Sequence, residues 1–113
     1  MGIDHLVVTT PRLDRTLPAL EAVGLEVRRT RDAGGGMRQA FLVAGPAVLE
    51  VVGDRPGAGP ARLWGVTFVV PDVDALAGRF GETLGTPRDA VQPGRRIVTA
   101  HGMDVPVAFM TPR

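Results

Sequence analysis

The side chains able to do chemistry are few in this 113-residue sequence. It contains no cysteine, tyrosine or serine, which excludes disulfides, thiolate metal sites and serine-nucleophile triads. Two histidines remain, His5 near the start of the chain and His101 near its end. A neutral imidazole and a carboxylate oxygen suit a divalent metal, and the same two groups can pass a proton. Such chemistry requires a histidine beside a carboxylate, and Glu50 stands inside an apolar run.

The basic residues are all arginine. There are thirteen of them, yet the formal net charge is only +1. A GC-rich genome explains this composition, and an anion-binding surface is the alternative, because guanidinium groups bind carboxylates and phosphates bidentately. The one local cluster, Arg28, Arg29 and Arg31, has no interleaved aromatic residue, so nucleic acid is not an expected partner. Arg95 and Arg96 follow a Pro-Gly turn and either clamp an anionic substrate group or are simply exposed.

Length and composition describe one ordered domain. With 113 residues, 44% of them hydrophobic and 22% charged, the chain is large enough to bury a core of its own. The N-terminus lacks the basic region and cleavage site of a signal peptide, and no apolar stretch approaches the roughly 20 residues that span a bilayer. We expect a cytoplasmic protein with no membrane partner.

An internal repeat organises the sequence. Residues 5–14 align without a gap on residues 65–74, because each segment has an apolar run, a proline, one further residue, an aliphatic residue and an aspartate. Apolar residues then recur at helical spacing as far as a glycine, Gly24 in the first half and Gly85 in the second. In both halves the proline stands where a helix begins, where its missing N–H costs nothing. Pro18 falls inside the first helix and predicts a short or kinked one.

Each predicted helix is followed by strand patterns, which makes each half β-α-β-β-β. The expected strands are residues 25–30, 38–43 and 47–52, then a weak 90–92, 96–100 and 105–110. The Gly34–Gly36 run predicts a hairpin turn, with a lid over a binding site as the alternative. The predicted organisation is a single α+β domain, with module one at 1–53, a linker at 54–62 and module two at 63–113. A ferredoxin-like domain is the runner-up, but its βαβ repeat leaves the third strand of each half without a place.

These residues carry a resemblance to a known superfamily. The Ile-Asp-His-Leu strand at residues 3–6 and the Leu-Glu-Val strand at 49–51 are similar to those of glyoxalase-like, or vicinal oxygen chelate, proteins. Residues 64–68 and 90–96 are similar to uncharacterised bacterial glyoxalase-like domains. The superfamily includes glyoxalase I, extradiol dioxygenases, methylmalonyl-CoA epimerase and bleomycin-resistance proteins. The resemblance covers almost the whole chain and implies two βαβββ modules whose mixed sheet forms a cup, with the helices outside.

The resemblance also implies where a metal would bind, on the first and last strands of each module. These positions hold His5 and Glu50 in module one, but Gly65 and Ala108 in module two, which offer no ligand. His5 and Glu50, with His101 as the candidate third ligand, would suit Zn, Ni, Mn or Fe. Alternatively no metal binds, and His5 hydrogen-bonds Glu50 or a backbone carbonyl. Glu50 would then be a catalytic proton acceptor, and His5 its proton donor or orienting partner.

Strand alternation predicts which other residues face the implied cup. If His5 and Glu50 face it, the large apolar residues that alternate with them, such as Leu6 and Leu49, face the helices. The same phase in module two points Thr67 and Met110 toward the cup. Ligand contacts are expected from four residues, Trp64, Thr67, Arg96 and Met110. Trp64 is either a flat wall for the ligand or a cap on the core.

Three functions remain open. The first is a small-molecule enzyme of glyoxalase-like type, a metal-assisted lyase, isomerase or dioxygenase in which the metal stabilises an oxyanion. The second is a non-catalytic drug- or antibiotic-binding protein of the bleomycin-resistance type. The third is a module that serves only dimerisation or regulation. We expect a small-molecule ligand in the cup and a homodimer, because two-fold pairs are the commonest oligomers.

Overall fold

The computed structural model describes residues 2–53 and 58–113 and divides the chain into two compact units. One unit is His5–Trp64, and the other joins residues 2–4 to Gly65–Arg113. The element order is β-α-β-β-β twice, with a short 3-10 helix added in the second half. This order confirms the predicted α+β fold of two βαβββ modules. The linker predicted at 54–62 lies outside the described residues over 54–57, and its last residue, Arg62, already belongs to a strand.

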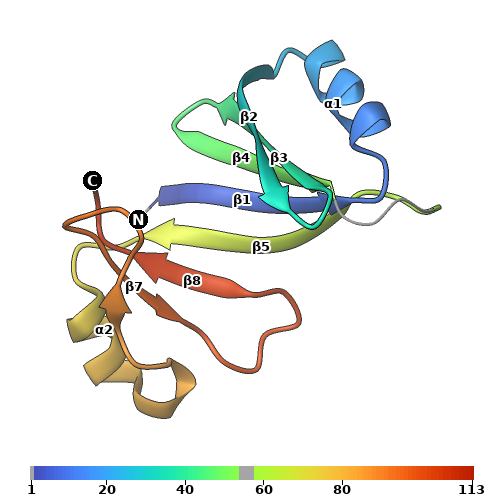
Figure 1. The fold of residues 1–113 in the computed structure, drawn as a ribbon. Helices are drawn as coiled ribbons and strands as arrows, with labels where there is room; N and C mark the ends of the chain where they lie inside the picture. Colours follow the sequence, from blue (N-terminus) through green and yellow to red (C-terminus); the bar gives the residue numbers. More distant parts are fainter. Residues whose placement is uncertain (1, 54–57) are drawn as a thin grey trace. The chain divides into compact units, whose positions relative to one another are not determined.

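Module one has a mixed, four-stranded sheet. Its strands lie in the order β2 (Glu26–Gly34), β3 (Met37–Ala44), β4 (Ala47–Gly53) and β1 (Gly2–Thr10). Hairpins make β2, β3 and β4 antiparallel, whereas β1 and β4 are parallel, because α1 (Leu13–Ala22) carries the chain back between β1 and β2 (Figure 1). The β2–β3 turn consists of Gly35 and Gly36, both with positive φ, which confirms the predicted hairpin.

Helix α1 shows how the repeated sequence pattern sets its ends. It begins at Leu13, shortly after Pro11, and ends before Gly24, which has the left-handed φ of 97°. The Leu25 N–H then bonds back to the Leu20 carbonyl at 3.2 Å, a helix-ending contact that such a glycine permits. Pro18 lies inside the helix without ending it, since a proline there removes one backbone hydrogen bond and only the last turn follows.

The core of module one lies between α1 and one face of the sheet. Ala40, Leu42, Leu49 and Val51 are buried there. The residues packed against them are Leu6, Val8, Leu13, Leu17, Leu20, Leu25 and Val27. Leu6 is in register with Leu49, and Val8 with Val51, so adjacent strands supply matching apolar positions to the same face. The predicted alternation, with these residues toward the helix, is confirmed.

Module two repeats this arrangement with shorter strands. Their order is β5 (Arg62–Val69), β8 (Val107–Met110), β7 (Arg96–Thr99) and β6 (Arg88–Asp89), with β5 and β8 parallel and the other pairs antiparallel. Helix α2 (Val73–Phe80) packs on one face near β7 (Figure 1). No helix in the described part of the chain is long and apolar enough to cross a membrane.

The core of module two uses the same phase as that of module one. Its buried members are Val70, Val73, Leu84 and Val98, with Leu76, Ala77, Ala100 and Phe109 packed against them. Phe68 and Phe109, which are paired in register on β5 and β8, stack with their ring centroids 5.9 Å apart. Both phenylalanines therefore lie on the face covered by α2, as the alternation predicts.

The second helix is shorter than its sequence pattern predicts. The apolar spacing continues to Leu84, but α2 ends at Phe80 because Gly81 takes a positive φ of 56°. A 3-10 helix, η1 (Gly81–Thr83), follows. Leu84 still reaches the core, because it forms a β-bridge with Ala100. The apolar spacing up to Leu84 therefore runs through the end of α2, the 3-10 helix η1 and a β-bridge, and not through one continuous helix.

The weak strand predicted at 90–92 is wrong. The strand in this part of module two is β6, which ends at Asp89. The Ala90 N–H bonds to the Arg95 carbonyl at 2.8 Å and closes the turn around Pro93-Gly94, so these residues form a turn. The turn at Pro93-Gly94 agrees with the dipeptide, which is typical of turns.

Neighbouring residues on β3 allow a test of the two-faced sheet. Leu42 is completely buried, whereas Val43 is 39% exposed on the opposite face. We expect Leu42→Ala to lower the free energy of unfolding by about 2–5 kcal/mol, because it leaves a cavity under α1. Val43→Ala, the matched control, should cost about 1 kcal/mol or less. Urea unfolding followed by circular dichroism measures both, and equal losses would contradict the assigned faces.

Candidate functional site

His5 and Glu50 lie on the same face of the module-one sheet, opposite the core. His5 on β1 is in register with Val48 on β4, and Val7 is in register with Glu50. Side chains of residues paired in register share a face, so His5, Val7, Val48 and Glu50 form one patch. Both candidate residues are half-buried. The fold therefore brings this predicted pair together on neighbouring parallel strands.

Glu50 is held by a neighbour that sequence reasoning missed. Gln39 Nε2 on β3 donates a hydrogen bond of 2.5 Å to Glu50 Oε1. Gln39 and Phe41 alternate with the core residue Ala40, which was the sequence signal that both share the face of Glu50. The Gln39 Oε1 atom is buried and has no hydrogen-bond partner among the described residues. A buried acceptor without a partner lowers the stability of the fold. The Gln39 amide is thus oriented to donate to Glu50 at the expense of a hydrogen bond to its own oxygen.

Strand β2 adds two arginines to this face. Arg29 is in register with Phe41, and Arg31 with Gln39. The Arg29 guanidinium carbon stands over the Phe41 ring, 4.7 Å from its centroid. We call the side of the module-one sheet opposite α1 the open face. Across the four strands its members include Glu26, Arg29 and Arg31, Gln39, Phe41 and Val43, Val48, Glu50 and Val52, and His5, Val7 and Thr9.

The corresponding face of module two has no charged side chain at the paired positions of β5, β7 and β8, and it is partly buried. Thr67 is in register with Ala108, and Met110 with Ile97, on the side opposite the stacked phenylalanines. Thr67 and Met110, both predicted ligand contacts, are 5% and 8% exposed. A Cβ added at Gly65 would lie 3.2 Å from the Pro106 carbonyl oxygen, closer than ordinary packing allows. The close approach of the Pro106 carbonyl therefore favours glycine at position 65.

The other two predicted residues have different surroundings. His101 is exposed and lies next to η1, where its backbone N–H bonds to the Thr83 carbonyl at 2.9 Å. It lines a surface hollow together with residues of α2, including Asp74. Trp64 on β5 is 53% exposed. The ligand-binding role of Trp64 and the metal-binding role of His101 stay predictions.

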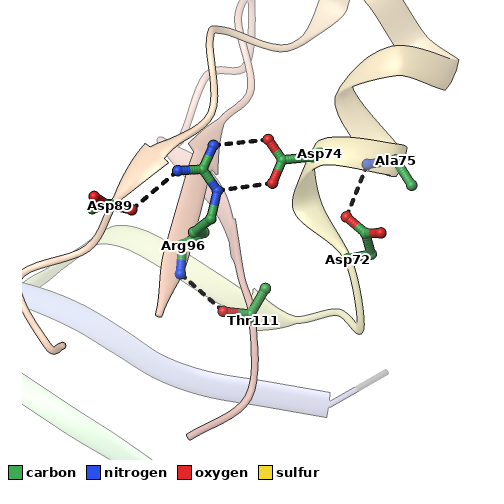
Figure 2. Close-up of polar contacts among 6 residues, drawn as sticks. All are labelled: Asp72, Asp74, Ala75, Asp89, Arg96 and Thr111. Atoms are coloured by element: carbon green, nitrogen blue, oxygen red, sulfur yellow. Dashed lines mark hydrogen bonds and ion pairs between the residues drawn. The ribbon is translucent and has the colours of Figure 1, made fainter. Parts of the chain in front are cut away.

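Arg96 is bound by acidic residues on the α2 side of module two (Figure 2). Its Nε and Nη2 donate to the two oxygens of Asp74 at 2.8 Å each, and its Nη1 donates to Asp89 Oδ1 at 3.0 Å. The Arg96 backbone N–H donates to Thr111 Oγ1 at 2.9 Å. Figure 2 also shows Asp72 accepting from the Ala75 N–H, which caps α2. The guanidinium predicted to clamp a substrate is therefore used within the module, on the face opposite Met110.

Arg95 is also engaged inside its unit, and it is almost completely buried, with 4% exposure. Its Nη2 donates to Asp4 Oδ1 at 2.8 Å, and its Nη1 to Gln92 Oε1 at 2.5 Å. Its Nε donates to the Thr111 carbonyl at 2.9 Å. Both arginines that the sequence offered as an anion clamp thus have internal partners.

Neither module gathers three metal ligands among its described residues. Module one supplies only His5 and Glu50, and the equivalent positions of module two are Gly65 and Ala108. The described part of the chain contains no group of three or more His, Cys, Asp or Glu side chains that could hold a metal ion. Catalytic zinc and iron sites commonly have three protein ligands. A site formed by His5 and Glu50 with His101 stays a prediction.

Comparison with known proteins identifies the fold. No protein-family model matches the sequence, and no curated protein matches it. Methylmalonyl-CoA epimerase from Mycobacterium tuberculosis is similar in structure, with 19% identity over 99% of this chain and 88% of that one, and a TM-score of 0.67. Glyoxalase I from Zea mays has 16% identity and a TM-score of 0.61, and the match covers 97% of this chain but 42% of that one.

A glyoxalase/bleomycin resistance protein/dioxygenase superfamily member from Vibrio splendidus is a further match. Its identity is 11%, over 94% of this chain and 96% of that one, with a TM-score of 0.58. These matches show that the chain has the fold of vicinal oxygen chelate proteins, which confirms the fold implied by the sequence resemblance. One fold hosts many activities, so the function has to be argued from the residues on its faces.

The ion pair between Arg96 and Asp74 makes a testable pH prediction. Hydrogen bonding to Arg96 holds the pKa of Asp74 below its usual value. A carboxylate whose folded-state pKa is lowered stabilises the fold above its unfolded pKa of about 3.9, and this contribution is lost as the pH falls. We expect Arg96→Gln to raise the pKa of Asp74 toward that usual value, measured by NMR titration of the carboxyl carbon.

The same titration contains its own control. The pKa of Asp14 is also lowered, by a hydrogen bond with Arg12 in module one. It should not change in the Arg96→Gln protein. A pKa of Asp74 that stays low in the variant would show that Arg96 is not its cause.

Proposed function

We propose that this protein binds a small molecule on the open face of module one and needs no metal to do so. The observation that carries the proposal is the hydrogen bond from Gln39 to Glu50 on the face that also holds His5. Partial burial of a carboxylate and an imidazole on one face costs folding free energy, and a face that served only for packing would have no need of them. Around this polar pair the face is lined by valines, the mixture typical of small-molecule sites.

The polar groups of the open face can orient a ligand and exchange a proton with it. Glu50 accepts from Gln39 through Oε1, and its Oε2 has no hydrogen-bond partner in the described part of the chain. That oxygen can accept a ligand O–H or N–H, or take a proton from it. His5 is the proposed proton donor. It lies on the neighbouring strand, two residues before Val7, the residue paired with Glu50. Whether the bound molecule then reacts depends on whether its acidic proton faces Glu50.

Methylmalonyl-CoA epimerase and glyoxalase I share the fold, so a metal-assisted enzyme is the second candidate. We expect protein purified without chelator or affinity-tag metal to contain far less than one metal ion per chain. The same should hold after loading with Zn, Ni, Mn and Fe, because two side-chain ligands hold such ions weakly. Mass spectrometry of total metal measures this. Near-stoichiometric metal that is lost in both His5→Ala and Glu50→Ala would instead establish the metal site.

Binding on the open face is tested with N-phenyl-1-naphthylamine, a neutral apolar dye that fluoresces on leaving water. We expect saturable binding to the wild type. Val48→Lys should weaken it by about tenfold or more, because the substitution places a charge in the middle of the face. Ala19→Lys, which adds the same charge on exposed α1, is the matched control and should bind as the wild type does. Unsaturable fluorescence, or equal binding by all three proteins, would refute the proposed site.

A further inference from the structure

The charges of β2 are unequally partnered. The acidic residues of this strand lie beside two arginines, Glu26 with Arg28 at 3.6 Å and Asp32 with Arg38 at 3.9 Å. Arg29 and Arg31, between these pairs, have no carboxylate within ion-pair distance in the described part of the chain. Two exposed guanidinium groups are thus left unneutralised next to each other on one strand.

Both of these arginines belong to the open face. The register places Arg29 beside Phe41, and Arg31 beside Gln39, which itself holds Glu50. The Arg29 guanidinium carbon lies 4.7 Å from the Phe41 ring centroid, and a guanidinium over an aromatic ring can still donate from its N–H groups. A planar donor group placed in this way is suited to a carboxylate, sulfonate or phosphate.

We propose that Arg29 and Arg31 form the anion-recognition end of the open face, so that its ligand is a small apolar acid. This inference rests on the proposed function and specifies its ligand class. Two strand spacings, about 10 Å, separate β2 from Glu50 on β4. The anionic group binds the two arginines, and the apolar body lies across Phe41, Val43 and Val48. A hydroxyl or amine at the far end reaches Glu50.

The acidic groups on this face do not cancel the attraction. Glu26 is in register with Val43 but lies beside Arg28. Glu50 accepts a hydrogen bond from Gln39, and no ion pair joins it to either arginine among the described residues. The local potential where the ligand's anion would bind is therefore set by Arg29 and Arg31.

Two dyes that differ in one group test the inference. 8-Anilinonaphthalene-1-sulfonate carries a sulfonate on the N-phenyl-1-naphthylamine skeleton. We expect the wild type to bind the sulfonate dye at least several-fold more tightly than the neutral dye. Arg31→Gln and Arg29→Gln should each weaken binding of the sulfonate dye by about tenfold, because each removes a charge-assisted hydrogen bond. Binding of the neutral dye to Arg31→Gln should stay within twofold of wild type.

Arg38→Gln is the matched control. It removes the same charge from the same hairpin, but Arg38 alternates with Gln39 and faces the other side of the sheet, next to Asp32. Its affinity for the sulfonate dye should equal that of the wild type. An equal loss in Arg38→Gln and Arg31→Gln would overturn the inference, because net surface charge would then explain the preference. Urea midpoints confirm that each variant is folded.

The two dyes also distinguish failure of the anion site from failure of the proposed function. Saturable binding of the neutral dye without any preference for the sulfonate would overturn the anion site and leave the proposed function standing. Failure of the wild type to bind either dye would overturn both. Binding of the sulfonate dye that is insensitive to Arg29→Gln and Arg31→Gln would place the anion elsewhere and reject this assignment.

Discussion

Among the described residues each module has a single α-helix, and one helix can cover only one face of a sheet. Burial of that face accounts for the arrangement of both halves. Core residues such as Leu42 on β3 and Val98 on β7 decide which alternate residues of their strands point toward the helix. A shift of one residue would turn the entire apolar set toward the other side. The same constraint decides where function can be, since polar groups such as Glu50 have only the uncovered face available.

Arginine partnerships form the second level of organisation. The aspartates repeated at the helix starts, Asp14 and Asp74, each pair with an arginine, Arg12 in module one and Arg96 in module two. The repeat therefore conserves an acidic position between the two halves while its partner comes from a different element. Arg95 is the buried member of this group. Because an isolated buried charge is very costly, its three acceptors all have to be in place when the unit folds.

The sequence predicted what depends on local pattern. Helix starts, the glycine turn and the inward phase of each strand follow from prolines, glycines and apolar spacing, and the structure agrees with them. Helix length in module two did not follow, because Leu84 keeps helical spacing after Gly81 has ended the helix. The partners of Arg95 could not be predicted either. Asp4 and Thr111 stand near opposite ends of the chain, and no periodicity relates them.

The candidate site was only half predictable for a related reason. His5 and Glu50 were found through the resemblance, but Gln39 became important only when the β3–β4 register was known. The cluster of Arg28, Arg29 and Arg31 is visible in the sequence, but the sequence does not show which acids neutralise which arginines. Pairing of Asp32 with Arg38 is a property of the hairpin register, and it is this pairing that leaves Arg31 available.

The two modules differ in what the faces opposite their helices contain. In module one that face keeps a histidine, a held carboxylate and two arginines without acidic partners. In module two the equivalent positions are small, and a side chain at Gly65 would press on the Pro106 carbonyl oxygen, which would have to shift by a few tenths of an ångström. In module one, the β2 arginines and Glu50 lie on the same face, two strands apart, so the proposed ligand would have to span that spacing to contact both.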